Sequence, residues 1–224
     1  MDIEILYDDC DVVLAVKPPA IPSAPDKTGD EDILSYLEKI YEKEIFIINR
    51  LDRPVSGIML FAKNKKSAEI LSKSMQESDI NKEYVAVCLG KFKEEKGELT
   101  DYLLKNQRLN ISSIVKKGTK GSKEAKLTYE VLDYKKTEEY GELTLVKVHL
   151  LTGRHHQIRV QLSGNGTPIF GDTKYNENFK KTRKFVNIAL FSCSLSFVHP
   201  KTKKVIKITA KPKTDIFQIF DFNI

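Results

Sequence analysis

The segment Arg50-Leu51-Asp52-Arg53 places one carboxylate between two guanidinium groups. Neighbouring cations favour the ionised form of an acid, so Asp52 could act as a nucleophile or as an electrostatic stabiliser. Pro54 fixes one backbone torsion and Gly57 permits a tight turn, which predicts a stiff loop around this carboxylate. A surface ion pair at a structural turn would use the same residues, because exposed charge triplets are common. The residues alone leave both interpretations open.

Two further side chains could serve chemistry at some distance along the chain. Tyr84 alternates with valines in a strand-like run, where a half-buried aromatic is the ordinary interpretation. A helix is expected from about Arg154 to Leu162, following Gly153. In such a helix Arg159 would share a face with His155 and His156 and could point into a pocket.

Metal and cofactor chemistry find little support in the sequence. His155 and His156 would point about 100° apart on a helix, without another His or Cys at ligand spacing, so a structural or RNA-contacting role is expected. Cys10, Cys88 and Cys193 form no CxxC pair and are expected to be core residues. A hydrolytic glycosidase would usually need a second carboxylate, and none obviously accompanies Asp52. We therefore expect no metal and no cofactor.

Patterning predicts more strands than helices. Helices are expected over residues 33–41, where apolar residues recur at helical spacing, and from a capping Asn64 through about Gln76. The expected strands cover residues 3–7, 12–16, 58–62, 82–89, 126–134, 143–151, 185–197 and 205–210. This mixture lacks the strand-helix alternation of a doubly wound sheet. It predicts an α+β fold around a mixed, mostly antiparallel sheet with flanking helices. We expect residues 1–224 to form one catalytic domain of two fused subdomains, approximately 1–105 and 106–224.

Charge indicates a polyanionic partner without proving one. The formal net charge is +6, and residues 178–214 carry ten Lys or Arg residues and no Asp or Glu. The Lys- and Gly-rich stretch Lys116–Lys123 has the composition of a mobile surface loop and could contact RNA. A solvated lysine-rich surface is the competing interpretation. A non-catalytic RNA-binding module or RNA chaperone would need these charges, but it would have no reason to place Asp52 at an RNA surface.

Four ordered blocks resemble the motifs of the RluA-type RNA pseudouridine synthases. The blocks are Asn49-Arg50-Leu51-Asp52-Arg53-Pro54-Val55-Ser56-Gly57 with Leu60-Phe61-Ala62-Lys63, then Lys82-Glu83-Tyr84-Val85-Ala86, then Thr152-Gly153-Arg154-His155-His156-Gln157-Ile158-Arg159, then Pro168-Ile169-Phe170-Gly171-Asp172-Thr173-Lys174-Tyr175. The opening strands up to Lys17-Pro18 are also similar, so the resemblance spans about residues 3–211. Asn49 stands where the family usually has His, Val55 where Thr is frequent, and Ala20 where Gly is common. These departures remove no charged catalytic group.

The resemblance implies the pseudouridine synthase fold with a central active-site cleft, and it implies roles for individual residues. Asp52 would be the essential carboxylate, Tyr84 would lie near the flipped base and could abstract a proton, and Arg159 would pair with Asp52. Arg50 would fill space in the opened RNA. Further RNA contacts are expected from Arg53, Arg154, His156, Gln157, Lys116 and Lys117. Whether Asp52 attacks uracil C6, attacks ribose C1′ or assists an elimination stays open.

The resemblance further implies isomerisation of specific uridines in structured transfer or ribosomal RNA. The chain starts at the catalytic strands, which predicts a compact form without the N-terminal S4-like RNA-binding domain of many relatives. No long apolar run or secretory signal is present, so a cytoplasmic protein that does not enter a membrane is expected. We also expect a monomer.

Overall fold

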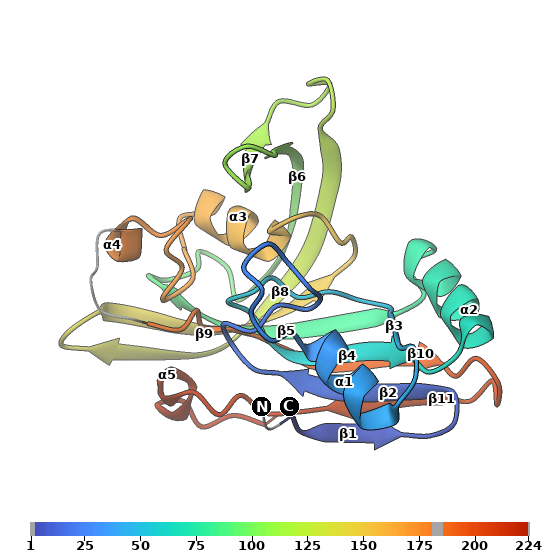
Figure 1. The fold of residues 1–224 in the computed structure, drawn as a ribbon. Helices are drawn as coiled ribbons and strands as arrows, with labels where there is room; N and C mark the ends of the chain where they lie inside the picture. Colours follow the sequence, from blue (N-terminus) through green and yellow to red (C-terminus); the bar gives the residue numbers. More distant parts are fainter. Residues whose placement is uncertain (1–2, 181–185, 224) are drawn as a thin grey trace. The chain divides into compact units, whose positions relative to one another are not determined.

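The chain forms two compact units in a computed structural model that describes residues 3–180 and 186–223 (Figure 1). The first unit consists of Met1–Lys82 and Phe191–Pro212, and the second of Glu83–Leu190 and Lys213–Asn223. The first unit is therefore discontinuous in sequence, because the chain completes most of the second unit before returning to it. The subdomain boundary expected near residue 105 falls inside a strand of the second unit, so the two units divide elsewhere.

The first unit is built on a mixed sheet. Its strands follow the order β1-β2-β4-β10, with β3 paired to β4 and β11 paired to β10. Their bounds are β1 Ile5–Asp8, β2 Val12–Lys17, β3 Phe46–Ile47, β4 Ser56–Ala62, β10 Leu190–Val198 and β11 Val205–Thr209. The β4–β10 pair is parallel and the other pairs are antiparallel. This confirms the expected mixed, mostly antiparallel arrangement.

Two helices of the first unit begin at polar caps. The Asp32 side chain accepts a hydrogen bond from the Ser35 N–H at the start of α1 (Ile33–Tyr41), and the Asn64 side chain accepts one from the Ser67 N–H at the start of α2 (Lys65–Gln76). Both helices confirm the expectations from sequence, including the cap at Asn64. The core of this unit includes apolar side chains from β2, β4, α2 and β10, among them Val12, Leu14, Ile58, Leu60, Leu71 and Phe197. Burial of this apolar surface is the main stabilising contribution.

The second unit is an antiparallel sheet with the strand order β5-β9-β8-β6-β7. The bounds are β5 Asn81–Leu89, β6 Lys96–Asn106, β7 Ile111–Val115, β8 Lys123–Thr137 and β9 Gly141–Leu150. Its helices are α3 Gln157–Gly164, α4 Glu177–Lys180 and α5 Asp215–Gln218. Strands β6 and β7 were not expected from sequence, and residues 181–184 of the expected basic face lie outside the described residues.

A close approach fixes the β6–β7 hairpin on α3. A Cβ on Gly164 would lie 2.4 Å from Cδ1 of Ile114, so β7 packs directly against the end of the helix. Leu103, Ala125 and Val160 form a small buried cluster between β6, β8 and α3, with Tyr175 packed against it. The hairpin is thus a packed part of the second unit, and the turn from β7 to β8 extends beyond α3 (Figure 1). Among the described residues no helix is long and apolar enough to span a membrane.

Candidate active site

Asp52 lies on the loop that leads into β4, and the backbone of this loop is held at several points. The Ser23 hydroxyl, which is buried, donates to the Leu51 carbonyl at 2.7 Å and accepts from the Leu51 N–H at 3.2 Å. The Asp52 carbonyl accepts from the Val55 N–H at 2.9 Å and closes a turn. Asp52 itself is partly buried. The loop that was expected to be stiff is therefore hydrogen-bonded at Leu51 and at Asp52.

Gly57 is required where the loop enters β4. Its φ of +120° lies in a region that L side chains rarely adopt. A Cβ at this position would lie 2.4 Å from the backbone nitrogen of Ser192 on β10. Gly57 thus permits the parallel β4–β10 pair, whose register includes Ser192 opposite Gly57.

Lys17 holds the same loop from the end of β2. It is fully buried, and its Nζ donates to the carbonyl oxygens of Pro18, Ile21 and Arg53 at 2.8, 2.8 and 3.0 Å. Burial lowers the pKa of Lys17 to about 7, and the Asp52 carboxylate opposes this shift by favouring the ammonium. Three carbonyl acceptors match the three protons of an ammonium group. Lys17 therefore links β2 to the backbone beside Asp52.

The two arginines that flank Asp52 differ in their surroundings. Arg53 forms an ion pair with Asp30, and its Nη2 also donates to the Thr28 hydroxyl at 2.9 Å. Arg50 is exposed. The expected RNA contact of Arg53 would therefore involve a guanidinium that already has a carboxylate partner, whereas Arg50 extends into solvent.

Asn49, which departs from the family's usual His, has a structural task. Its Oδ1 accepts from the Leu60 N–H at 2.7 Å, and its side chain is buried. The amide thus ties the segment before Asp52 to the middle of β4. Although Asn49 differs from the family's usual His, its side chain therefore still anchors the loop that carries Asp52.

In the second unit, Tyr84 lies on β5 opposite Val148 of β9. Its side chain is only 6% exposed. A buried tyrosine on a paired strand is held in a fixed position by its neighbours.

Arg159 of α3 forms a buried bidentate ion pair with Asp172. Its Nε donates to Oδ2 at 2.8 Å and its Nη2 donates to Oδ1 at 2.7 Å, with side-chain exposures of 3% and 1% for the arginine and the aspartate. The Tyr175 ring lies beside the guanidinium, 5.2 Å from its Cζ to the ring centroid. Sequence reasoning missed Asp172 and Tyr175 as partners of Arg159, because Gly171-Asp172 is also ordinary turn chemistry.

The two histidines precede α3, which corrects the helix start expected at Arg154. His156 has a φ of +55°, a left-handed conformation that keeps it out of the helix. The rings of His155 and His156 stack with centroids 3.7 Å apart, so they do not diverge as adjacent helical residues would. His156 is buried and its Nδ1 lies 2.7 Å from the Tyr175 hydroxyl, while Nδ1 of His155 lies 2.8 Å from Oγ of Ser112. They join α3 to β7.

Gln157 builds the loop before α3. Its Oε1 accepts from the Thr152 hydroxyl and the Arg154 N–H, and its Nε2 donates to the Lys126 carbonyl. Because the side chain is 3% exposed, the RNA contact expected for Gln157 would require this loop to open. Arg154 is exposed, and its Nε donates to the Glu124 carbonyl at 2.8 Å.

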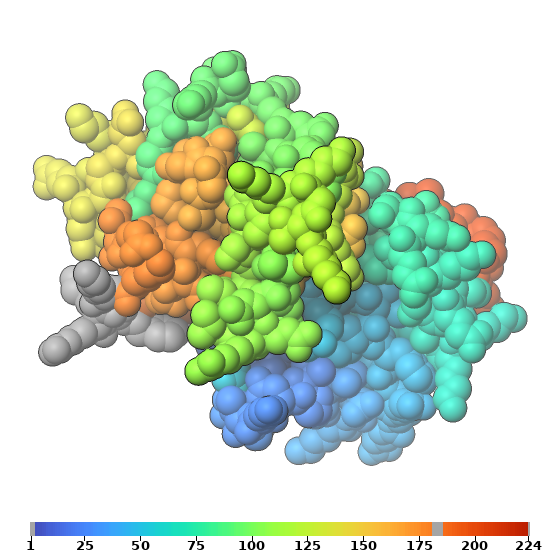
Figure 2. Space-filling model, turned by 90° about the horizontal axis from the view of Figure 1, so that it is seen from above, coloured from blue at the N-terminus to red at the C-terminus, as the bar shows by residue number. Residues whose placement is uncertain are grey.

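The expected RNA-contacting lysines lie on a one-signed arm of the second unit. This arm, residues 102–123, comprises the end of β6, all of β7 and the turn to β8. It contains Lys105, Arg108, Lys116, Lys117, Lys120 and Lys123 without any Asp or Glu. All six side chains are exposed. In the space-filling view the arm's light green atoms stand on the viewed face (Figure 2).

A cluster of possible metal ligands in the first unit has a structural task. Ligand atoms of Asp9, Asp11 and His199 lie within 4.8 Å of one another. However, His199 Nε2 is hydrogen-bonded to Asp9, and its Nδ1 accepts from two backbone N–H groups of the following turn. The cluster thus fastens the β1–β2 turn to the β10–β11 turn.

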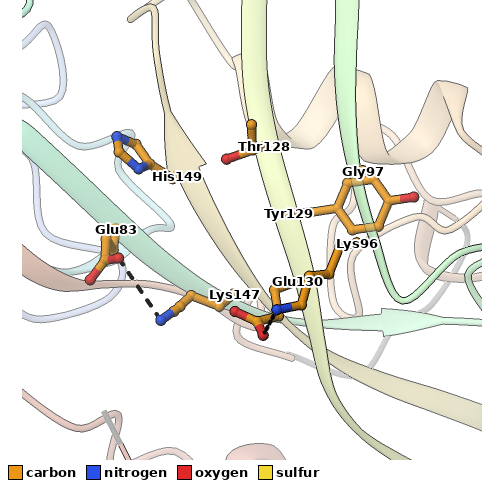
Figure 3. A pocket seen from close by; sticks show the side chains of 8 residues that line it. All are labelled: Glu83, Lys96, Gly97, Thr128, Tyr129, Glu130, Lys147 and His149. Carbon is orange, nitrogen blue, oxygen red and sulfur yellow. Dashed lines mark ion pairs between the residues drawn. The ribbon is translucent and has the colours of Figure 1, made fainter.

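A polar groove of about 400 Å³ lies on the sheet of the second unit (Figure 3). Its charges are paired across the strands, with Glu83 facing Lys147 at 3.9 Å and Lys96 facing Glu130 at 2.7 Å. Balanced charges of this kind do not select an anionic ligand, so the groove is a poor candidate for the RNA site.

Comparison with known proteins decides the family. The model described as RNA pseudouridylate synthase matches residues 11–164 of the chain. This chain belongs to the RNA pseudouridylate synthase family. It is 33% identical over 226 residues to tRNA pseudouridine synthase C of Haemophilus ducreyi, an alignment covering 94% of this chain and 91% of that protein.

Other members are similar to nearly the same extent. Dual-specificity RNA pseudouridine synthase RluA of Vibrio parahaemolyticus is 30% identical over 204 residues, covering 89% of this chain and 79% of that protein. Ribosomal large subunit pseudouridine synthase C of Buchnera aphidicola from Acyrthosiphon pisum is 30% identical over 213 residues, covering 92% of this chain. The chain spans 66% of the length of that Buchnera protein. These similarities confirm the RluA-type assignment.

Solved structures confirm the pseudouridine synthase fold. Human RNA pseudouridylate synthase domain containing 1 matches with a TM-score of 0.79 and 22% identity, covering 94% of this chain and 84% of that one. The family match at residues 11–164 includes Asp52, Tyr84 and Arg159, whereas Asp172 and Tyr175 lie beyond it. It also includes Lys17, whose buried contacts the sequence did not indicate.

Proposed function

We propose that the chain isomerises specific uridines to pseudouridine in structured RNA, with Asp52 as the essential carboxylate. The reaction breaks the bond from ribose C1′ to uracil N1 and forms a bond from C1′ to uracil C5. The C5 proton is removed and N1 gains a proton, so no atom is gained or lost overall. Such chemistry needs a positioned carboxylate, a proton acceptor and a site that retains the detached uracil.

The observation that carries the proposal is the support around Asp52 in a member of this family. Ser23 and Lys17 hydrogen-bond to the backbone of its loop, and Gly57 permits the close pairing of β4 with β10 where the loop ends. A loop held at several points keeps a carboxylate in one orientation, which favours catalysis over a mere surface ion pair.

The other roles in the proposal come from the motifs. Tyr84 lies near the flipped base and removes the proton at C5, and Arg50 occupies the space that the uridine leaves. Arg159, besides its pair with Asp172, is an ionic partner of Asp52. The solvent exposure of Arg50 and the fixed setting of Tyr84 are consistent with these roles.

RNA contacts in the proposal come mainly from the basic arm, residues 102–123. Exposed cations without neighbouring acids neutralise phosphates, and this contact positions an RNA without reading its sequence. Lys116 and Lys117 stand in its turn, as expected from sequence. Relatives named for transfer RNA and for ribosomal RNA are similar to this chain to nearly the same extent, which supports transfer RNA, ribosomal RNA or both as the substrate. A monomer in the cytoplasm completes the proposal.

An assay with Asp52→Asn tests the proposal most directly. Total RNA from cells lacking the gene is incubated with purified protein, and pseudouridine is mapped by a chemistry selective for the modified base. The wild type should introduce the modification, and Asp52→Asn should reduce single-turnover rates by roughly 10⁴-fold or more while retaining RNA affinity. Asp79→Asn, an exposed carboxylate in the turn after α2, is the matched control and should retain full activity.

The products separate the alternatives. Release of free uracil would identify a glycosidase, and RNA binding without any product would identify a non-catalytic RNA-binding protein. Full activity of Asp52→Asn would remove this carboxylate from the reaction.

A further inference from the structure

The Asp172 carboxylate orients the guanidinium group of Arg159. The bidentate contact with Asp172 uses Nε and Nη2, which fixes the plane of the guanidinium as well as its position. Both side chains are almost fully buried. A buried ion pair loses the hydration of two charges and contributes little net stability, so stability alone does not account for it.

Asp172 is set in place by its own turn. Its Oδ1 accepts from the backbone N–H groups of Lys174 and Tyr175, at 2.9 and 3.2 Å. The preceding Gly171 has a φ of +76°, and a Cβ there would lie 2.3 Å from the Asn187 carbonyl oxygen. The turn therefore determines where the carboxylate lies, and the long side chain of Arg159 adjusts to it.

Tyr175 supports the same guanidinium on its face. Its ring lies 5.2 Å from Cζ of Arg159, within the range of a cation–π contact. The hydroxyl of this tyrosine accepts from the Ser112 N–H at 2.7 Å and is hydrogen-bonded to His156. Ser112 belongs to β7, so this chain of contacts connects Arg159 to the basic arm.

We propose that Asp172 is a positioning residue for Arg159 and that Tyr175 is its second support. Asp172 orients the guanidinium for the part that Arg159 takes in the isomerisation, and Tyr175 connects that orientation to the basic arm, residues 102–123. This inference rests on the proposed function, because it assigns Arg159 a part in the isomerisation.

A double-mutant cycle on single-turnover isomerisation tests the proposal. Asp172→Asn retains the shape and the backbone hydrogen bonds but loses the charge, so the guanidinium is no longer held bidentately. We expect the rate constant to fall by roughly 100-fold with RNA affinity unchanged. In an Arg159→Lys background the same substitution should change the rate by only about twofold, because lysine has no plane to orient.

Controls separate positioning from stability. Leu143→Ala removes buried apolar volume from β9, and it should lower the free energy of unfolding while retaining the rate at temperatures where the protein is folded. Equal losses from Asp172→Asn with arginine and with lysine at position 159 would overturn the proposal. If Asp172→Asn does not fold, Tyr175→Leu is measured in the same cycle and should also be non-additive with Arg159→Lys.

A second measurement does not depend on activity. The Nε–H signal of Arg159 in an ¹⁵N NMR spectrum should exchange slowly with water in the wild type and rapidly in Asp172→Asn. A wild type without isomerase activity but with this NMR difference would contradict the proposed function and still confirm the orientation of Arg159. An unchanged signal in the variant would refute the role of Asp172.

Discussion

At the scale of single residues, an unusual feature of the first unit is that the side-chain amine of Lys17 is fully buried. Lys17 uses a strand-end position to reach three carbonyl oxygens, one of which belongs to the residue after Asp52. An amine in this setting is opposed by burial and favoured by its acceptors and by the Asp52 carboxylate. Its protonation therefore connects pH with the order of the loop that carries Asp52.

The pKa of about 7 for Lys17 predicts a pH-dependent stability. Below pH 7 both the folded and the unfolded chain hold the proton, so the contribution is constant. Between pH 7 and pH 10.5 the unfolded chain binds a proton that the folded chain has released, so the free energy of unfolding rises with pH. The rise should be up to about 1.4 kcal/mol per pH unit.

Urea unfolding of the wild type and of Lys17→Met at several pH values checks this prediction. The difference in free energy of unfolding between the two proteins should change in favour of the wild type as the pH increases. A difference that is constant across this range would show that Lys17 keeps its proton when buried.

At the scale of elements, the entry into β4 combines a strained backbone with a close contact. Gly57→Ala would need a Cβ at a φ of +120° and 2.4 Å from the backbone nitrogen of Ser192. Gly29→Ala is a matched control, because Gly29 also has a positive φ, +71°, but no atom lies within 4 Å of the place that a Cβ would occupy there. Gly29→Ala should destabilise the first unit by about 1 kcal/mol.

Gly57→Ala should be at least about 2 kcal/mol more destabilising than Gly29→Ala, because β4 or β10 must shift. Denaturant unfolding of both variants measures this difference, and the isomerisation rate of the folded fraction reports whether the Asp52 loop has moved. Equal effects would mean that β10 adjusts without strain at this point.

Elements with strong local signals were predictable, and elements made by distant contacts were not. The helices of the first unit follow from apolar spacing and from the Asn64 cap, and the stiff Asp52 loop follows from Pro54 and Gly57. Strands β6 and β7 escaped prediction because few of their side chains are buried, so they lack apolar alternation. Helix α3 begins at Gln157 and not at Arg154 because His156 has a left-handed backbone conformation. A histidine at this position only weakly predicts such a conformation.

The same distinction applies within the candidate site. The Asp52 motif is contiguous, so its residues could be recognised together. Lys17 is remote from Asp52 in sequence, and a lysine is ordinarily expected at the surface. Asp172 contacts Arg159 only because the segment after α3 folds back onto the helix. In the sequence, Gly171-Asp172 indicates a turn and does not predict that contact.

At the scale of the whole molecule, the net charge of +6 is distributed unevenly along the chain. The arm at residues 102–123 has a single sign of charge, whereas the groove on the sheet of the second unit has paired charges. The basic stretch at 178–214 is divided between the two units, so it is not one face of a single unit. The arm is therefore the better defined electrostatic site.

Replacing Lys116 and Lys117 together by Gln should weaken RNA binding and reduce its dependence on salt. Each lost phosphate contact should lower the slope of log affinity against log salt concentration by about 0.7 to 0.9. Lys39→Gln with Lys43→Gln makes the same change of charge at exposed positions near α1 and should leave the slope unchanged. Identical slopes for the two double variants would exclude the arm as an RNA contact.

The return of β10 to the first unit has a consequence during protein synthesis. A nascent chain that has left the ribosome as far as β4 must wait for nearly all of the second unit before β10 can pair with it, a delay on the order of ten seconds. During that interval one edge of β4 lacks its partner and is open to chaperones or to mispairing. The packing of Gly57 against Ser192 therefore forms only after nearly all of the second unit has been synthesised, so the loop that carries Asp52 gains this contact late.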